Sequence, residues 1–574
     1  MIISSGAEFT KLYSPSPYHR LQADAFLNGH LYLADSIYKT RHDLAWHAGY
    51  VHQVWGLGVG MWLVPFEAIW RLFGQKWFPD RMALCVAFAL IAFYAASTAD
   101  RLRILYRNRR FGMGVAALIA FCPSIWALIR GPGLVYEETS LYACLVSLGI
   151  LVALIRVACF GKRCDYLICA ALSAMSPLVR PTHGIYGLLG IVVCSAILLV
   201  RRRMFATVVF GGVVFVAGLV LLAVTNWVRF GSIMEFGHRL TTTPGLIVFM
   251  TRIDNPMHDA SAGDAAKELI GELFFLYHPR NNPKITTSPW EASYARWRDP
   301  CVTTFDLSWA IICAAGIVGS TSWIAMKKGK SAVLQEFFSR PGTTLVFGVL
   351  VWAGISTVVL FRFYLYFPNL SARYLLDFAP AFTGFGILVW IFLSYFLHDA
   401  ALGLLAAWLA CEIASTESSV LPVPPQTRNE ILTMLPAANG RKISDCMGSY
   451  ASDNCPKETQ IAYNGYGWDC KSEEAGSVVI LAVDRPQFVE LLVSNRLDQI
   501  THPKRSDFYR AMIDAQFLNL RSVTQEGELL RVRFDVPESI QHHAGDELLF
   551  LCFSKGFDDE DRDSNRMLRS VRWR

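Results

Sequence analysis

Charged side chains are scarce in this chain of 574 residues, in which Asp, Glu, Lys and Arg together make up 17%. A soluble protein of this size carries about 25%. Hydrophobic residues reach 53%, and the mean hydropathy is +0.33. This composition excludes an ordinary soluble protein and predicts a polytopic membrane protein. The net charge of +6 is therefore no argument for nucleic-acid binding, because Lys and Arg in such a chain mark the cytoplasmic ends of spans.

Signals for signal-peptide cleavage and for metal binding are also missing. The first 40 residues lack the basic front and apolar core of a cleavable signal peptide. The 14 cysteines form no CxxC pair, and no HExxH motif occurs, so no metal centre is specified. Nine of the cysteines lie in or beside apolar runs, where we expect them to pack as small hydrophobic side chains.

Ten apolar runs approach the roughly 20 residues that a helix needs to cross a membrane. Basic clusters at 101–110, 156–163, 201–203 and 327–330 are each separated by two such runs, which places all four on the cytoplasmic side. The fold class predicted is an α-helical polytopic membrane protein with about ten transmembrane helices. The runs are 82–99, 113–129, 139–155, the short 166–179, 184–200, 204–226, 307–326, 341–361, 378–397 and the short 400–411.

The segment 54–74 is apolar but contains Pro65, Glu67 and Arg71. A charge near the centre of a span costs about 2.5–3.5 kcal/mol on insertion scales, and the four tryptophans of this region suit a helix at headgroup level. We therefore expect an interfacial or re-entrant helix, with residues 1–80 outside. That expectation implies a transmembrane helix upstream of Met1, unless the segment 54–74 itself crosses.

The composition changes from about residue 417, where the proline-rich linker "SVLPVPPQ" begins. The runs "SVVILAV", "QFVELLVS", "LLRVRFDV" and "ELLFLCFS" alternate as strands do, and predict an extracytoplasmic β-sandwich. Outside the cell, Cys446, Cys455 and Cys470 could form disulfides. The aromatic "YNGYGWD" suits either a carbohydrate-binding module or a structural cap.

The predicted domains are therefore an external loop with interfacial helices (1–80), two parts of a transmembrane bundle (81–228 and 305–416), an external loop between them (229–304) and the β-rich domain (417–574).

Several short segments occur together in the order of a known family. They are "SPSPYHRLQADAFLNGHLYL", "HDLAWHAGYVHQVWGLGVGMWLVPFEAIWRLFG", "VYEETSLYA", "LVRPTHGIYGLLG", "NWVRFGSIMEFGHRL" and "ARYLLDFAPAF". Between about residues 14 and 395 the chain resembles bacterial membrane glycosyltransferases of the GT-C superfamily, relatives of protein O-mannosyltransferases and aminoarabinose transferases.

The resemblance implies an inverting transfer of a sugar from a polyprenyl-phosphate donor, at the outer face of the bacterial inner membrane. The acceptor would be a cell-envelope glycan, lipid or protein, and membrane lipid would surround the enzyme, with no role for nucleic acid. The resemblance leaves open whether a divalent cation takes part as a cofactor.

Inverting transfer needs a base within hydrogen-bond reach of the acceptor hydroxyl. In the family an acidic pair early in the first loop supplies it, but "SPSPYH" contains no acid. The candidate catalytic residues are therefore the other loop carboxylates, Asp43, Asp35 and Asp24. Asp43 comes first because basic residues surround it in "RHDLAWH". The alternatives are a surface turn or helix cap for Asp43, a turn cap for Asp35, and the polar face of an interfacial helix for Asp24.

The departing phosphate needs positive charge or a metal. The guanidinium of Arg373, just outside a span, suits a phosphate oxygen, although snorkelling to the headgroups explains it equally well. Glu137 and Glu138 precede the run 139–155 at its outer end. Either they face a cavity, or they are simply favoured there by the dipole at a helix N-terminus. The candidate substrate- and phosphate-binding residues are Arg373, Tyr374, Arg180, His183, Glu137 and Glu138.

Two other functions stay open at this point. A transporter or flippase for a lipid-linked sugar would share the polytopic pattern, but the spans contain few charges and no recognisable pair of repeats with broken helices. A GT-C fold that binds the carrier without turning it over is favoured by the missing acidic pair.

Overall fold

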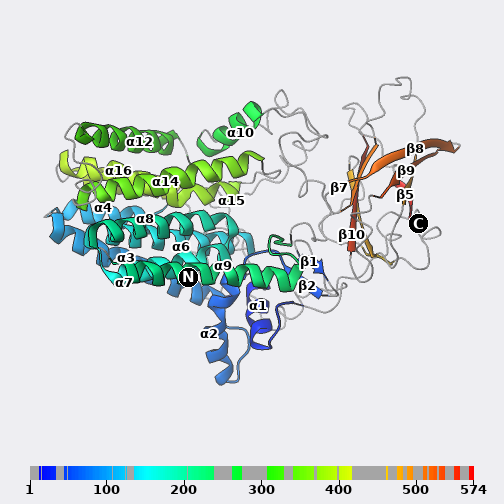
Figure 1. Ribbon diagram of the computed structural model, residues 1–574, viewed down its shortest axis with the longest axis horizontal. Helices are drawn as coiled ribbons and strands as arrows, with labels where there is room; N and C mark the ends of the chain where they lie inside the picture. The colour runs from blue at the N-terminus through cyan, green and yellow to red at the C-terminus, as the bar shows by residue number, and fades with distance from the viewer. Residues whose placement is uncertain are drawn as a thin grey trace.

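The computed structural model describes 12–33 (without 15), 44–47, 50–122 (without 107), 125, 135–237 (without 203), 262–274, 305, 307–328, 341–366, 372–396 and 400–415, and in the C-terminal part the strands between 460 and 573 with 518 and 536. Helices dominate the part before residue 416 (Figure 1). They are α1 (Tyr18–Leu27), α2 (Gly58–Leu72), α3 (Asp80–Tyr106), α4 (Arg109–Ala120), α6 (Val135–Phe160), α7 (Arg163–Val179), α8 (Gly184–Arg202), α9 (Phe205–Phe230), α10 (Ala262–Phe274), α12 (Leu307–Lys328), α14 (Pro341–Tyr366), α15 (Ala372–Leu375), α16 (Ala379–Phe396) and α17 (Ala400–Ser415), with the 3-10 turns η2 (Pro181–His183) and η6 (Leu376–Phe378).

Six helices of the described part are long and apolar enough to cross a membrane. This confirms the coarse prediction of a helical membrane protein. Helices α4, α7, α12 and α17 occupy the other four predicted runs but do not belong to this set. The six are Asp80–Tyr106, Val135–Phe160, Pro181–Arg201, Phe205–Phe230, Gly342–Tyr366 and Leu376–Ser394.

Helix α6 is the centre of the bundle. It is almost wholly buried, and it packs against α3, α7, α8 and α14. A helix that is apolar on all sides gains most by burial among other helices, which explains the central place of α6. In contrast, α3 and α9 expose many apolar side chains, as expected of helices that face lipid.

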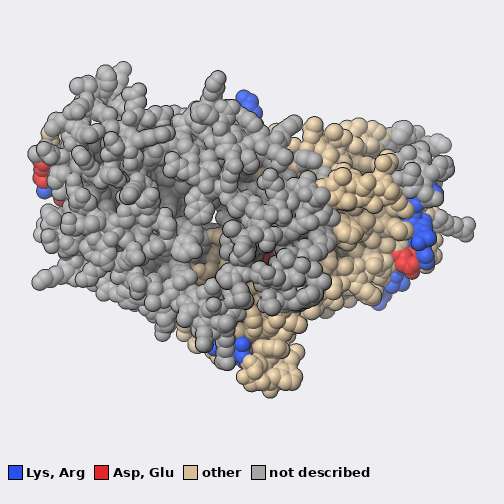
Figure 2. All heavy atoms as spheres, turned by 180° about the vertical axis from the view of Figure 1, so that it is seen from behind, with Lys and Arg blue, Asp and Glu red and all other residues tan. Residues whose placement is uncertain are grey.

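Charged side chains gather at one end of the bundle, where α3, α6 and α8 end and α4, α7 and α9 begin; this end is called the basic end. Arg103, Arg109, Lys162 and Arg163 are exposed there. Figure 2 shows the blue and red atoms at this end, beside a flank without charge. An uncharged flank next to a basic rim is what a membrane-spanning bundle requires.

Helix α2 runs across the direction of the bundle helices (Figure 1). It contains Pro65, and Ile69, Leu72 and Phe73 at its far end are exposed. It is not among the helices of spanning length. Its orientation agrees with an interfacial helix, whose depth in a membrane stays a prediction.

The opposite end of the bundle, called the hairpin end, carries the antiparallel strands β1 (Leu44–His47) and β2 (Tyr50–Gln53). The chain leaves α9 through Gly231, whose φ of 69° is a conformation that glycine adopts readily. The segment then folds back over the hairpin, since a Cβ on Gly237 would lie 3.2 Å from Ala45 Cβ. The hairpin, Phe230 and Val135 share one hydrophobic cluster.

The C-terminal strands form two sheets, in the orders β3-β4-β10-β6-β7 and β11-β5-β9-β8. All four predicted alternating runs are strands, namely β4, β5, β9 and β10. Their packing as a sandwich stays a prediction, and Cys446, Cys455 and Cys470 lie outside the described residues. The strands are β3 (Gln460–Ala462), β4 (Ala475–Leu481), β5 (Phe488–Ser494), β6 (Tyr509–Ile513), β7 (Gln516–Phe517), β8 (Asn519–Glu526), β9 (Leu529–Asp535), β10 (Leu548–Lys555) and β11 (Leu568–Trp573).

Candidate functional site

Two buried polar clusters lie at the hairpin end, and the first two turns of α6 contribute to both. The Arg20 cluster consists of Ser14, Arg20, Asp80, Arg81 and Glu138. The Asp377 cluster consists of Ser140, Arg180, Thr182, His183, Tyr364 and Asp377. Buried charges are stable only when they are paired and hydrogen-bonded, so each cluster is described by its pairs.

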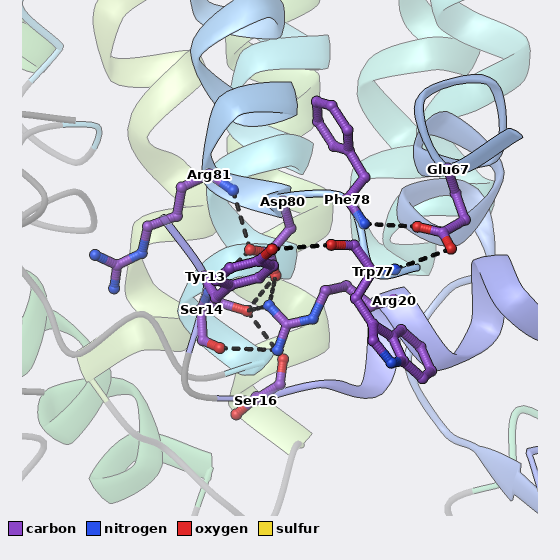
Figure 3. A network of polar contacts seen from close by, with 9 residues as sticks. All are labelled: Tyr13, Ser14, Ser16, Arg20, Glu67, Trp77, Phe78, Asp80 and Arg81. Atoms are coloured by element: carbon purple, nitrogen blue, oxygen red, sulfur yellow. Dashed lines mark hydrogen bonds and ion pairs between the residues drawn. The ribbon is translucent and has the colours of Figure 1, made fainter. Parts of the chain in front are cut away.

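Asp80, the first residue of α3, is the centre of the Arg20 cluster (Figure 3). Its Oδ2 lies 2.5 Å from Arg20 Nη1 and accepts a 2.5 Å hydrogen bond from the Ser14 hydroxyl. Its Oδ1 accepts from the backbone N–H groups of Ser14 (2.9 Å) and Arg81 (3.0 Å). Both oxygens of Asp80 are thus occupied, and the carboxylate fastens the segment before α1 to the start of α3.

Glu67 has a comparable structural role beside this cluster. It accepts hydrogen bonds from the backbone N–H groups of Trp77 (3.1 Å) and Phe78 (2.6 Å), and Trp77 has a positive φ of 70°. The Tyr13 hydroxyl donates to the carbonyl of Trp77 (3.1 Å), as Figure 3 shows. Glu67 therefore fixes the turn between α2 and α3. These backbone hydrogen bonds explain why the apolar helix α2 contains a buried acid.

Unlike Asp80, Glu138 has a carboxylate oxygen that accepts no hydrogen bond from the described residues. It is 6% exposed and lies close enough to Ser14, Asp80, Arg20 and Arg81 to interact with them. Among the described residues its Oε2 has no hydrogen-bond partner. The side chain of Arg81 extends away from Asp80 in Figure 3. The cluster thus combines one saturated carboxylate, one carboxylate with a free acceptor oxygen, and two guanidinium groups.

The next residue of α6, Thr139, connects to α1. Its hydroxyl donates to the carbonyl of Val135 (2.6 Å), so it accepts from His19 Nε2 at 2.9 Å. Burial lowers the pKa of His19 to about 3, helped by the nearby Arg20 charge and opposed by a backbone hydrogen bond with Val135. His19 is therefore neutral at physiological pH and serves as a hydrogen-bond donor.

Asp377 accepts contacts from three helical segments at once. Arg180 Nε lies 3.0 Å from Oδ1, and His183 Nε2 lies 3.2 Å from the same oxygen. The hydroxyls of Thr182 (2.7 Å) and Tyr364 (2.5 Å) donate to Oδ2. The carboxylate therefore joins η2, α14 and η6 inside the bundle.

Arg180 connects the Asp377 cluster to α6, because its Nη1 donates to the Ser140 hydroxyl at 2.7 Å. Burial alone would lower the pKa of Arg180, but Asp377 and Tyr364 raise it above its ordinary value. The guanidinium is thus a fixed cation whose charge is balanced by Asp377.

The structure brings several predicted residues together. Arg180 and His183 both contact Asp377, and the guanidinium carbon of Arg180 lies 5.6 Å from the centre of the Tyr374 ring. Arg373 belongs to α15, but its side chain is outside the described part. Glu137 and Glu138 are both buried in the first turn of α6, and Glu138 belongs to the Arg20 cluster.

The three candidate bases fare differently. Asp24 pairs with Arg71 and, at 3.2 Å, with Lys76, which favours a structural role in holding α1 against the end of α2. Asp35 and Asp43 lie outside the described residues, so their roles stay predictions.

Sequence reasoning missed Asp80 and Asp377. Each stands at the start of a long apolar run, a place where a single buried acid signals a polar contact within the bundle. As for metals, the described ranges contain no group of three or more His, Cys, Asp or Glu side chains that could hold an ion.

Comparison with known proteins finds no family model that matches the chain and no curated protein similar to it. The resemblance carried by the short segments therefore stays a hypothesis, and the case for a function rests on the geometry of the two clusters.

Proposed function

We propose that this protein is an inverting glycosyltransferase that moves a sugar from a polyprenyl-phosphate donor to a cell-envelope acceptor, with Glu138 as the general base. The observation that carries the proposal is the buried Glu138 beside the cations Arg20 and Arg81, whose Oε2 accepts no hydrogen bond from the described residues. A base needs an unoccupied acceptor oxygen, and a departing phosphate needs positive charge nearby.

In the proposed reaction the acceptor hydroxyl attacks the anomeric carbon of the sugar from the side opposite the phosphate. The bond between the acceptor oxygen and the anomeric carbon forms while the bond from that carbon to the phosphate oxygen breaks. The electron pair leaves with the phosphate, and the hydroxyl proton moves to Glu138 Oε2. Arg373 keeps its predicted role at the phosphate, whereas Arg180, already balanced by Asp377, orients the surrounding helices.

The finer topology belongs to the same proposal. The hairpin end would face the outside of a bacterial inner membrane and the basic end the cytoplasm, in agreement with the exposed cations at 103, 109, 162 and 163. Helices α4, α7, α12 and α17 would complete ten spans. The strands after residue 460 would form an extracytoplasmic sandwich.

A transfer assay tests the proposal, with membranes that contain the protein and radiolabelled polyprenyl-phosphate sugars. We expect Glu138→Gln to abolish transfer while the protein is still produced and folded. Asp100→Asn is the control, because Asp100 is an exposed acid that pairs with Arg103 at the basic end. Full transfer in Glu138→Gln would exclude it as the base, and loss in Asp43→Asn or Asp35→Asn alone would assign the base to that residue.

The rival functions predict other outcomes. A flippase would move the labelled lipid across a liposome membrane without forming a glycosylated product. A carrier-binding protein would retain the labelled lipid and show neither flipping nor transfer. Either result, with a donor that the protein binds, would contradict the transferase proposal.

A further inference from the structure

Arg229 differs in its partners from Arg20, Arg156 and Arg180, three other largely buried arginines of the described part. Arg20, Arg156 and Arg180 each lie within 3.0 Å of a carboxylate oxygen. Arg229 is 3% exposed, yet its three hydrogen bonds go to neutral oxygens at the hairpin end. Nε donates to Thr225 O (3.3 Å), Nη1 to Gln53 O (3.1 Å) and Nη2 to Asn226 Oδ1 (2.9 Å).

These contacts balance only part of the charge. Arg229 stands in the last turn of α9, where the helix dipole is equivalent to about half a negative elementary charge. The guanidinium carbon also lies 4.6 Å from the centre of the Phe230 ring, a second weak attraction. A guanidinium cannot lose its proton in a protein, so the described residues leave about half a charge for another group to balance.

Gln53, whose main chain contacts Arg229, carries unused donors of its own. Its side chain is 0% exposed, and in the described part of the chain neither the amide oxygen nor the amide nitrogen has a hydrogen-bond partner. A buried amide without partners is rare and calls for an explanation. The adjacent His52 is also buried, and its Nδ1 likewise has no partner among the described residues.

We infer that Arg229 and Gln53 form a binding site for a phosphate group at the hairpin end. A guanidinium has five N–H donors, and three are used in the contacts above. The two others and the Gln53 amide can all donate to phosphate oxygens, for which the planar guanidinium is well suited. The inference deepens the proposed function, on which the choice of a lipid-borne phosphate rests, because a polyprenyl-phosphate donor brings such a group to this end of the bundle.

Thermal unfolding of the purified protein in detergent tests the inference without any transfer reaction. Three probes are titrated at constant ionic strength: inorganic phosphate, a short polyprenyl phosphate and phosphatidylglycerol. A ligand that binds only the folded protein raises the midpoint of unfolding with its concentration. We expect at least one probe to do so for the wild type and for Arg103→Gln, which removes the same charge from an exposed site at the basic end.

Two variants probe the site itself. For Arg229→Gln we expect the apparent Kd to rise roughly ten- to hundredfold, as for a lost hydrogen-bonded charge. Gln53→Leu keeps the carbonyl that Arg229 uses and removes only the side-chain donors, so we expect roughly tenfold weaker binding. Its midpoint without ligand should be higher than that of the wild type, because an unpaired buried amide is gone.

The outcomes show which kind of molecule supplies the phosphate and whether the inference is correct. A response to inorganic phosphate identifies a site for the free anion as well, whereas a response to the lipids alone identifies a headgroup or carrier site. If no probe raises the midpoint of the wild type more than that of Arg229→Gln, the inference is wrong. Absence of transfer in the wild type, together with phosphate binding that Arg229→Gln weakens, would instead contradict the proposed function and leave this site standing.

Discussion

Replacing Asp377 by Asn is the most direct test of how the hairpin end is held together. The carboxylate lies 1% exposed between Arg180, His183, Thr182 and Tyr364. Asn has nearly the same shape but no charge, and one of its two terminal atoms donates instead of accepting. The substitution therefore removes the only carboxylate that Arg180 contacts in the described structure, without opening a cavity.

The expected loss follows from what remains around Arg180. Its side chain is 12% exposed, so water cannot replace the lost charge, and the hydroxyls of Ser140 and Thr182 are neutral. Removing one partner of a buried ion pair costs about 3–5 kcal/mol, because the other charge stays buried. A typical domain is stable by only about 5–15 kcal/mol, so the variant should lose a large share of its stability.

Unfolding in mixed micelles with increasing SDS measures the effect. Asp24→Asn is the control, because Asp24 is 17% exposed and its partners Arg71 and Lys76 are 29% and 39% exposed. Such a pair is worth less than about 1 kcal/mol. The double variant Arg180→Gln, Asp377→Asn should recover part of the loss, since no unbalanced charge remains. If Asp377→Asn unfolds at the same SDS fraction as Asp24→Asn, the reasoning about the buried pair is refuted.

Two further predictions concern packing and protonation, both measured by the same unfolding assay. Gly112→Ala would place a Cβ 2.2 Å from the carbonyl oxygen of Ala99 and should destabilise the protein by about 1–3 kcal/mol. Gly212→Ala, with no heavy atom within 4 Å, should instead be neutral or stabilise by up to about 1 kcal/mol. Because burial lowers the pKa of His19 from 6.5 to about 3, its contribution is present above about pH 6.5. It should be lost as the pH falls, by about 1.4 kcal/mol per unit, and His19→Gln should remove this part of the slope.

The sequence allowed the membrane class to be predicted, and also the gathering of the basic clusters at one end of the bundle, because both depend on local pattern. Apolar length decides whether a helix can span, and the basic clusters near 101–110, 156–163 and 201–203 fall at every second junction between helices, namely α3–α4, α6–α7 and α8–α9. Helices that alternate in direction bring those clusters to the same end of the bundle. The short helix α7 also follows from sequence, since it contains Pro177 and is followed by Arg180 and Pro181.

The polar clusters could not be predicted in the same way, because their pairs are far apart in the chain. Arg20 and Asp80 are separated by 60 positions, and Arg180 and Asp377 by 197. No spacing rule relates such residues, and only the tertiary packing of the helices brings them together. The partners of Asp24 were likewise invisible in sequence, which is why it entered the set of candidate bases.

The proposed base and the inferred phosphate site are joined by the start of α6. Val135, three positions before Glu138, packs in one cluster with Phe230 and Val51 of β2, next to Arg229 and Gln53. We therefore expect the two sites to bind one substrate, and substitutions in them to have different effects. Glu138→Gln should lose transfer yet keep the phosphate-dependent rise of the unfolding midpoint, because Glu138 is not one of the donors inferred to hold the phosphate.

Arg229→Gln should weaken donor binding, so KM for the lipid-linked sugar rises roughly tenfold or more, while a saturating donor restores much of the rate. Steady-state kinetics in detergent, with Arg103→Gln as the control, measures the separate effects on KM and kcat. If Arg229→Gln lowers kcat as strongly as Glu138→Gln does and leaves KM unchanged, the two residues act at one point in the reaction. The separation of base and phosphate site at the hairpin end would then be wrong.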